Sequence, residues 1–494
     1  MTENQEAGRV SDLLRQASSS ARKARSRLER RRRPQRLPLS YGQQRLWFID
    51  QMESGSPEYN MPEALRLRGK LNCEALRWTI NMIVERHEVL RTHFLEVDGD
   101  PVQMIEPTLR ISVPLEDLTG LGTEAKQEAV QEVMRREVQE PFNLSRGPLL
   151  RVRLLRLDME DHILLRTVHH IVSDGWSQGV FNREFAMLYP AYGQSGAHLP
   201  EELPVQYADY ALWQRTWLAE EMESGLAYWK KQLAGMPERL ELPFDRMPQN
   251  RMLVAESYRA TFTPEQMAGL KHLSTENRAT PYMTMLAGFA VLLSRHSGQD
   301  DIVVGSPIAN RQDPQLEGLI GCFVNSLVMR VRLKPEMSFR NLLAEVRTMA
   351  LEAYQHQDLP FARLVEELAP KRSLNATPIF QVSFAQRNAP WEPQKLGGLE
   401  ITPVGEAQVG AHYDLDVHAW FRGAGAEILW LYNRNVFDPW RIEQMAAQYV
   451  RILDAVMADA GSQLAALPLL SSDERRQILG RWNETVRAIA EETL

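Results

Sequence analysis

The sequence is poor in cysteine, has no long apolar run and carries no excess of positive charge. Its two cysteines, Cys73 and Cys322, lie far apart without ligand-like spacing, so neither a disulfide framework nor a cysteine-based metal site is indicated, and a reducing cytoplasm is the expected location. No stretch of about 18 apolar residues predicts a membrane span, and no charged-then-apolar start predicts secretion. The formal net charge of −7 argues against bulk nucleic-acid binding. We therefore expect neither membrane nor nucleic acid among the partners.

The chain is long and apolar enough for more than one folding unit. Its 494 residues are 44% hydrophobic, which predicts a large core and favours two lobes. The one basic block, Arg22 to Arg36, ends a polar segment over residues 1–36 that has hardly any apolar periodicity. Such a segment cannot bury a core, so we expect a solvated linker or a partner-docking segment, with a nucleic-acid-binding arm as the weaker alternative.

The most distinctive local pattern is a pair of histidines, His169 and His170, followed by Asp174 and Gly175. A leucine-rich run precedes the histidines and a helical pattern follows Gly175, which predicts a strand that ends at the histidines and a turn into a helix. Successive strand side chains point to opposite faces, so one histidine is expected to be chemical and the other structural unless the strand breaks there. Three interpretations compete: metal ligation, which adjacent strand histidines disfavour; a buried histidine beside a helix cap by Ser173 or Asp174; and a general base or hydrogen-bond donor.

Other motifs in the chain favour the third interpretation. The run from His169 to Gly175 resembles the HHxxxDG signature of the condensation domains of nonribosomal peptide synthetases, which are relatives of chloramphenicol acetyltransferase. That short pattern is weak alone, but further segments match the family in order. They are Leu39 to Phe48 (LSYGQQRLWF), Arg86 to Phe94 (RHEVLRTHF), Tyr207 to Trp213 (YADYALW), Val304 to Arg311 (VGSPIANR), Phe323 to Ser326 (FVNS) and His356 to Phe361 (HQDLPF). The resemblance covers about Leu37 to Met457, and Leu467 to Thr485 is similar to the linker that leads into an adenylation domain.

Helical and strand patterns alternate along the chain, which predicts an α/β fold. A helical pattern over Ala75 to Val89 and a strand pattern over Leu149 to Leu157 are echoed over Pro281 to His296 and Asp301 to Pro307. The resemblance implies two chloramphenicol-acetyltransferase-like αβ lobes in a V, with a central tunnel that substrates enter from opposite faces. The expected organisation is a linker or docking segment, an N-terminal lobe, a C-terminal lobe and a linker toward an adenylation domain, over residues 1–36, 37–215, 216–466 and 467–494 respectively.

The activity that the resemblance implies is amide-bond formation. The amine of an aminoacyl group, held as a thioester on a carrier protein's phosphopantetheine arm, attacks an acyl thioester donor. Proximity is worth about 7–11 kcal/mol in well-oriented systems and a positioned base about 10²–10⁴-fold. We expect no metal and no intrinsic cofactor, because the phosphopantetheine arms belong to partner carrier proteins. The expected partners are a downstream aminoacyl carrier protein and adenylation domain, with acyl-CoA or an upstream carrier protein as the donor.

The family motif implies which residues act. His170 is expected to face the tunnel, where it either takes the proton of the attacking amine or orients that amine, while His169 is packed or hydrogen-bonded within the lobe. Gly175 leaves space where the pantetheine arms meet, and its backbone N–H is a candidate donor to the thioester oxygen. Asn325 is either a polar group opposite the histidine or a strand-end amide that caps backbone groups.

Other motif residues are expected to be structural. A carboxylate turned away from the tunnel needs a buried partner, so we expect Asp174 to pair with Arg91 or Arg311. Four aromatic residues at near-helical spacing are expected in the core rather than in a stacking platform, and two polar motif residues are expected to fix a loop. These are Trp213, Trp217, Tyr228 and Trp229, and His356 and Gln357.

Two classes of function stay open. The first is an active condensation enzyme, either a starter domain that N-acylates from acyl-CoA or an elongation domain with a carrier-bound donor. The second is a catalytically silent recruitment platform, and an epimerization domain is a lesser rival. Platforms of this kind usually lose the second histidine, so the presence of His170, Asp174 and Gly175 favours activity. Only a short polar segment precedes Leu39, so we expect a donor that arrives in trans and favour starter acylation.

Overall fold

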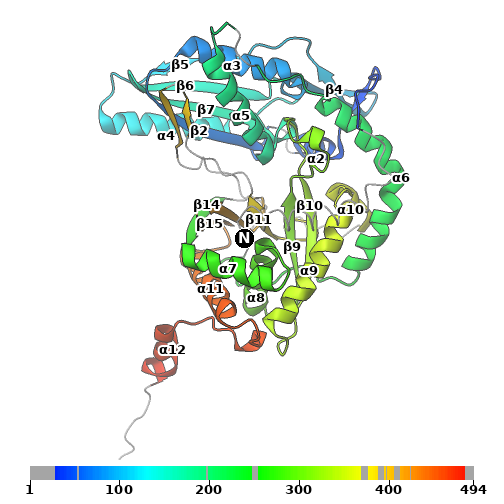
Figure 1. Ribbon diagram of the computed structural model, residues 1–494, viewed down its shortest axis with the longest axis vertical. Coiled ribbons are helices and arrows are strands. Elements are labelled where there is room, and N and C mark those ends of the chain that lie inside the picture. Colours follow the sequence, from blue (N-terminus) through cyan, green and yellow to red (C-terminus); the bar gives the residue numbers. More distant parts are fainter. Residues whose placement is uncertain are drawn as a thin grey trace, which may run out of the picture.

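The molecule has two lobes, each built around a six-stranded sheet. The structure, a computed structural model, describes residues 28–52, 55–195, 199–247, 254–368, 377–387, 394–396, 398–404, 412–422 and 424–483. In Figure 1 the lobes lie one above the other, and the long helix α6 (Tyr207–Leu233) runs along one side from the upper to the lower lobe. Among the described helices, none is long and apolar enough to cross a lipid bilayer.

The upper, N-terminal lobe holds a sheet with strand order β12-β13-β2-β7-β6-β5. Apolar residues occupy both faces of its central strands: Leu154 and Leu164 join the core beneath α3 and α5, and Leu155 and Ile163 join a smaller core beneath α4. A strand that is buried on both faces has a continuous apolar sequence instead of an alternating one. This explains the leucine-rich segment before His170. The bounds are β2 Asn60–Arg68, β5 Leu115–Asp117, β6 Leu150–Asp158, β7 Asp161–His169, β12 Gln394–Leu396, β13 Leu399–Pro403, α3 Cys73–Arg86, α4 Thr123–Gln139 and α5 Gly175–Ala191.

The lower, C-terminal lobe holds a sheet with strand order β10-β9-β11-β14-β15-β8. Its main core joins one face of the sheet, through residues such as Val417 and Trp430, to helices α7, α8, α9 and α11. Helix α8 is apolar on all sides, as expected for the central helix of a core. The bounds are β8 Ala255–Phe262, β9 Asp301–Ile308, β10 Asn325–Arg332, β11 Val382–Arg387, β14 Leu415–Arg422, β15 Gly425–Asn433, α7 Pro264–Glu276, α8 Pro281–Ser297, α9 Phe339–Gln355 and α11 Pro439–Ala458.

Smaller elements complete the lobes. Three strands form a separate sheet in the order β1-β4-β3, and helix α2 lies near the one-turn helix that follows β7. The bounds are β1 Leu37–Pro38, β3 Thr92–Val97, β4 Asp100–Ile105, α2 Tyr41–Met52, α10 Phe361–Leu368 and α12 Ser472–Leu479.

The repeated helix and strand patterns correspond to real elements with clear ends. Helix α3 begins after Asn72, whose side chain accepts hydrogen bonds from the backbone N–H groups of Glu74 and Ala75. Helix α8 begins after Thr280, which caps it in the same manner, and ends at Gly298, whose φ of 71° is a left-handed conformation that favours glycine. The predicted helices and strands therefore agree with the observed ones to within a few residues.

The lobes are not the two contiguous segments that we expected. The expected boundary at residue 215 falls inside α6, whose first half packs in the N-terminal core and whose last half packs in the C-terminal core. Strand β13 leaves the C-terminal half and pairs with β2, which covers an edge that would otherwise expose unpaired backbone groups. Residues 311–323, the crossover segment, place Leu316, Leu319 and Phe323 in the N-terminal core.

The described end of the N-terminal segment belongs to the fold rather than to a linker. Leu28 is buried in the N-terminal core, and its carbonyl oxygen accepts a hydrogen bond from the Gln315 side chain at 3.1 Å. Arg33 lies 2.6 Å from Glu88 in an ion pair. The expected boundary at residue 36 is therefore too late for residues 28–36, while residues 1–27 lie outside the described part of the chain.

Candidate active site

The strand that carries the two histidines breaks between them. Strand β7 ends at His169, and His170 begins a single 3-10 turn, with its backbone N–H donating to the Tyr59 carbonyl at 2.9 Å. The Nδ1 atom of His169 accepts a hydrogen bond from the Ile171 N–H at 3.1 Å, and the ring meets Phe142 edge-on. Burial lowers the pKa of His169 to about 3. His169 is thus an uncharged, internally bonded residue.

His170 is half-buried and presents one ring nitrogen for chemistry. Burial is the main cause that lowers its pKa, while a hydrogen bond of the ring to the residue's own backbone and the Asp174 carboxylate act in the opposite direction. Only Nδ1 can reach a histidine's own carbonyl, and the tautomer with its hydrogen on Nδ1 leaves Nε2 as the acceptor. The Cys322 Sγ lies 3.9 Å from Nδ1. The lowered pKa favours the neutral ring near pH 7, and Cys322 lies on the Nδ1 side of that ring.

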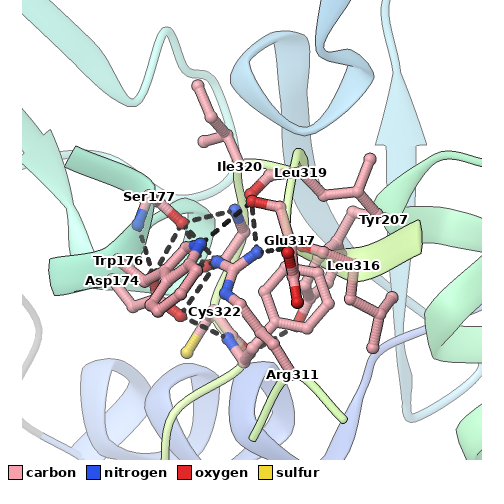
Figure 2. Close-up of polar contacts among 12 residues, drawn as sticks. Asp174, Trp176, Ser177, Tyr207, Arg311, Leu316, Glu317, Leu319, Ile320 and Cys322 are labelled. Carbon is pink, nitrogen blue, oxygen red and sulfur yellow. Dashed lines mark hydrogen bonds and ion pairs between the residues drawn. The ribbon is translucent and has the colours of Figure 1, made fainter. Parts of the chain in front are cut away.

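Asp174 lies at the centre of a buried polar cluster that joins the lobes (Figure 2). Its Oδ1 caps helix α5 by accepting the Ser177 N–H at 2.8 Å and the Ser177 hydroxyl at 2.7 Å. Its Oδ2 accepts the Phe323 N–H at 3.0 Å, and Arg311 Nη2 lies 3.1 Å from Oδ1. The carboxylate therefore ties the helix that follows the histidines to the crossover segment.

Arg311 extends this cluster along the crossover segment. Its Nη1 donates to the carbonyl oxygens of Leu316 and Leu319 at 2.5 and 2.7 Å, and its guanidinium stacks on Phe323, 4.0 Å from the ring centroid. The Arg311 and Asp174 side chains are 2% and 3% exposed. At that depth an isolated charge is strongly unfavourable, so each needs the other.

Arg91, the alternative partner proposed for Asp174, lies elsewhere. Its Nη1 donates to the Glu106 carbonyl and its Nη2 to the Glu85 carbonyl, the latter at 3.5 Å. The Glu106 N–H in turn donates to the Arg91 carbonyl at 2.9 Å. Arg91 therefore fastens the end of strand β4 to the short helical turn that contains it, and of the two candidates it is Arg311 that pairs with Asp174.

Gly175 is the first residue of helix α5 and is exposed. A Cβ built on it would meet no atom within 4 Å, so the glycine borders open space rather than a close packing contact. The first N–H groups of a helix have no acceptor within the helix and lie at its positive end. The backbone at Gly175 can thus accommodate a neighbouring group and stabilise a negative oxygen.

The Asn325 side chain takes the second of its two expected roles. Its Nδ2 donates to the carbonyl oxygens of Gln357 and Leu359 at 2.9 and 2.8 Å, and its Oδ1 accepts the Phe361 N–H at 3.0 Å. Those contacts use both amide hydrogens, so we correct the catalytic assignment: Asn325 is a clamp on the loop before α10. His356 belongs to the same loop, and its ring stacks on Tyr228 at 4.1 Å.

The expected core aromatics are core residues. Trp213, Trp217 and Trp229 are buried, and Tyr228 packs against the C-terminal core. The rings of Trp213 and Trp217 stack with centroids 5.3 Å apart. These residues fix α6 between the lobes and offer no stacking platform to a ligand.

Two residues that act on His170, His412 and Arg45, were not predicted from the sequence. His412 stacks on Tyr59 with centroids 5.4 Å apart, lies 3.5 Å from Glu58, and acts with Arg45 to lower the pKa of His170. Arg45 belongs to the family motif Leu39 to Phe48, but that motif alone indicated no role for it. His412 lies outside the family motifs, so only the three-dimensional arrangement identifies it.

The comparisons with known proteins agree with the family resemblance. A family described as Condensation domain matches residues 34–479. The chain is 43% identical over 457 residues to a linear gramicidin synthase of Brevibacillus parabrevis, covering 92% of this chain and 6% of that protein. It is 41% identical over 448 residues to the phosphinothricin tripeptide synthetase PhsC of Streptomyces viridochromogenes, covering 90% of this chain and 41% of that protein. The chain thus spans less than half the length of each of these two relatives.

A solved structure gives the same picture of the fold. The X-domain from teicoplanin biosynthesis superposes with a TM-score of 0.81 at 28% identity, over 90% of this chain and 100% of that one. The chloramphenicol-acetyltransferase-like α/β fold is thus confirmed. With a family match over most of its length, the chain belongs to the condensation-domain family of nonribosomal peptide synthetases.

Proposed function

We propose that the protein forms an amide bond between an acyl thioester donor and the amine of an aminoacyl group held on a carrier protein. The observation that carries this proposal is the environment of His170: a half-buried ring whose pKa is lowered by burial, in the turn that leads into the open N-terminal end of α5. A neutral imidazole suits the single proton transfer that aminolysis of a thioester requires.

His170 and Gly175 have complementary roles in this reaction. The amine nitrogen attacks the thioester carbon, a C–N bond forms, and Nε2 of His170 accepts or orients the amine proton. The negative oxygen of the tetrahedral intermediate faces the backbone N–H of Gly175. The C–S bond then breaks, the sulfur receives the proton, and the new amide stays on the acceptor arm. Most of the acceleration comes from holding both thioesters close, about 7–11 kcal/mol in well-oriented systems.

His169, Asp174 and Arg311 act through structure in this proposal. His169 holds the turn, and the Asp174–Arg311 pair holds α5 against the crossover segment. None of the three needs to touch substrate. The phosphopantetheine arms come from the carrier partners, and the protein supplies no cofactor of its own.

A silent recruitment platform is the second candidate function. The X-domain neighbour has also been solved in a complex with OxyB from the same biosynthesis. We favour the active enzyme because catalysis needs the open space at Gly175 and a His170 ring whose lowered pKa favours the neutral form, and docking needs neither.

The experiment supplies the protein with an aminoacyl-loaded carrier protein and a panel of donors: acyl-CoAs and acyl or peptidyl carrier proteins. Intact-protein mass spectrometry of the acceptor carrier identifies the product. An added acyl mass is expected, and the donor that supplies it distinguishes starter acylation from elongation. If no donor transfers, although the protein binds the loaded carrier, the platform function replaces the enzyme.

A further inference from the structure

The Nδ1 side of the His170 ring is closed by a cysteine that the proposed reaction does not use. Cys322 is 4% exposed, and its Sγ lies 3.9 Å from Nδ1. Burial, reinforced by Asp174, raises the pKa of the thiol well above its ordinary value. A neutral thiol beside a neutral imidazole is not a thiolate–imidazolium pair, so Cys322 is not an activated nucleophile.

Tyr207 holds Cys322 in place. The Tyr207 hydroxyl donates to the Cys322 carbonyl at 2.7 Å and also bonds Ser40 Oγ at 2.7 Å. Its ring lies so close to the crossover segment that a Cβ at Gly321 would come within 2.0 Å of it. The ring also meets Phe323 edge-on at 4.9 Å. Tyr207 thus packs against the residues on both sides of Cys322, and Figure 2 draws Tyr207 and Cys322 in the same polar cluster.

Helix α2 supports both Cys322 and the turn that carries His170. A Cβ at Gly42 would lie 3.3 Å from the Cys322 carbonyl oxygen and 3.5 Å from Sγ. The next residue, Gln43, donates from Nε2 to the Ile171 carbonyl at 3.3 Å. One helix therefore sets the distance between the sulfur and the imidazole.

We propose that Tyr207 and Cys322 are positioning residues for His170: Tyr207 holds Cys322 against the Nδ1 side of the ring, so that Nε2 points at the reacting atoms. This rests on the proposed function for its catalytic consequence. The Sγ excludes water from Nδ1, and because a thiol is a weak hydrogen-bond donor it leaves that nitrogen free to carry the ring's proton.

The first test measures single-turnover rates of Cys322→Ala and Tyr207→Phe with a loaded carrier and a competent donor. Both variants are expected to lose about tenfold in rate constant at saturating carrier, less than the about 10²–10⁴-fold that a complete acid–base group supplies, with the carrier concentration for half-maximal rate unchanged. Tyr210→Phe is the matched control, because it removes a buried hydroxyl one helical turn away that bonds Gln214 instead. Wild-type rate constants in folded Cys322→Ala and Tyr207→Phe would overturn the proposal.

The second test does not depend on activity. The pKa of His170 is measured by an NMR titration of histidine-labelled protein. The protein has eleven histidines, and the resonance of His170 is the one that is absent from the spectrum of His170→Ala. In Cys322→Ala, water reaches Nδ1 and relieves burial, so the pKa of His170 is expected to rise toward its ordinary value. An unchanged titration of His170 would contradict the contact, even if the wild-type protein transfers no acyl group and the proposed function itself fails.

A third test isolates the link between the two residues and applies even if Cys322→Ala does not fold. In a Cys73→Ser background, Cys322 is the remaining thiol. Tyr207→Phe is expected to speed alkylation of Cys322 by iodoacetamide under native conditions, and Tyr210→Phe is not. Equal alkylation rates in the two variants would show that Tyr207 does not hold Cys322.

Discussion

At the scale of single residues, the chain separates two adjacent histidines by environment rather than by type. Both have a lowered pKa because of burial. Nevertheless, His169 uses its Nδ1 to accept the Ile171 N–H, whereas the Nε2 of His170 remains available. A break in the strand produces this difference, since an unbroken strand would only send the two rings to opposite faces.

The lowered pKa of His170 predicts the pH dependence of the rate. The neutral form is the competent one, so the single-turnover rate should rise with pH through the pKa of His170 and then level off. Because burial lowers that pKa, the midpoint should lie below about 6.5, the ordinary histidine value. A rate–pH profile between pH 4 and 8 measures it, with a stability check at each pH. A midpoint above the ordinary value would contradict the buried, neutral ring.

The buried ion pair predicts opposite phenotypes for two motif residues. Asp174→Ala leaves Arg311 charged and buried without its carboxylate, at a cost of about 3–5 kcal/mol. We expect a lower melting temperature for Asp174→Ala than for wild type, and none of that loss for His170→Ala. Differential scanning calorimetry of the two variants makes the comparison. If Asp174→Ala melts like wild type but is inactive, the carboxylate belongs to the chemistry.

At the scale of elements, segments that are distant in sequence meet around His170. Helix α2, the turn after β7, helix α6 and the crossover segment all contribute, through Gln43, His170, Tyr207 and Cys322. The sequence could predict the strand, the turn and the helix at the histidines, because these depend on local patterns. It could not predict which residue of the crossover segment faces His170, because that contact is set by packing between lobes.

Long-range packing also explains the other differences between the predicted and the observed contacts. The sequence allowed two roles for Asn325, a polar group opposite His170 or a strand-end amide that binds backbone groups. Only its hydrogen-bond partners decide between these two roles. Strand β13 pairs with β2 across more than half of the chain, and no local pattern signals such an exchange. The Asp174–Arg311 pair was among the two expected pairings, and a charge motif alone did not distinguish Arg311 from Arg91.

The contacts of residues 28–36 predict that this element stabilises the N-terminal lobe. Deletion of residues 1–36 removes the buried Leu28 and the Arg33–Glu88 ion pair, and a buried leucine side chain is worth about 1.5–3 kcal/mol. Deletion of residues 1–27 retains both and is the control. We expect a lower melting temperature for the longer deletion than for the shorter one. Equal melting temperatures would show that residues 28–36 contribute nothing to the fold.

At the scale of the whole molecule, α6, β13 and the crossover segment are among the links that the described residues form between the lobes. His170 lies where the crossover segment meets the N-terminal lobe. This arrangement explains why the polar cluster around Asp174 is buried although it joins residues from both halves of the chain. The relative position of the lobes is thus coupled directly to the geometry beside the His170 ring.

The most direct test of this account is a single-turnover transfer assay that compares wild-type protein with His170→Ala, using a loaded acceptor carrier and whichever donor the panel identifies. Intact-protein mass spectrometry measures the acylated acceptor over time, and calorimetry confirms that both proteins are folded. We predict amide product with the wild-type protein and a rate at least about two orders of magnitude lower with His170→Ala. A folded His170→Ala variant that transfers the acyl group at the wild-type rate would contradict the role of His170.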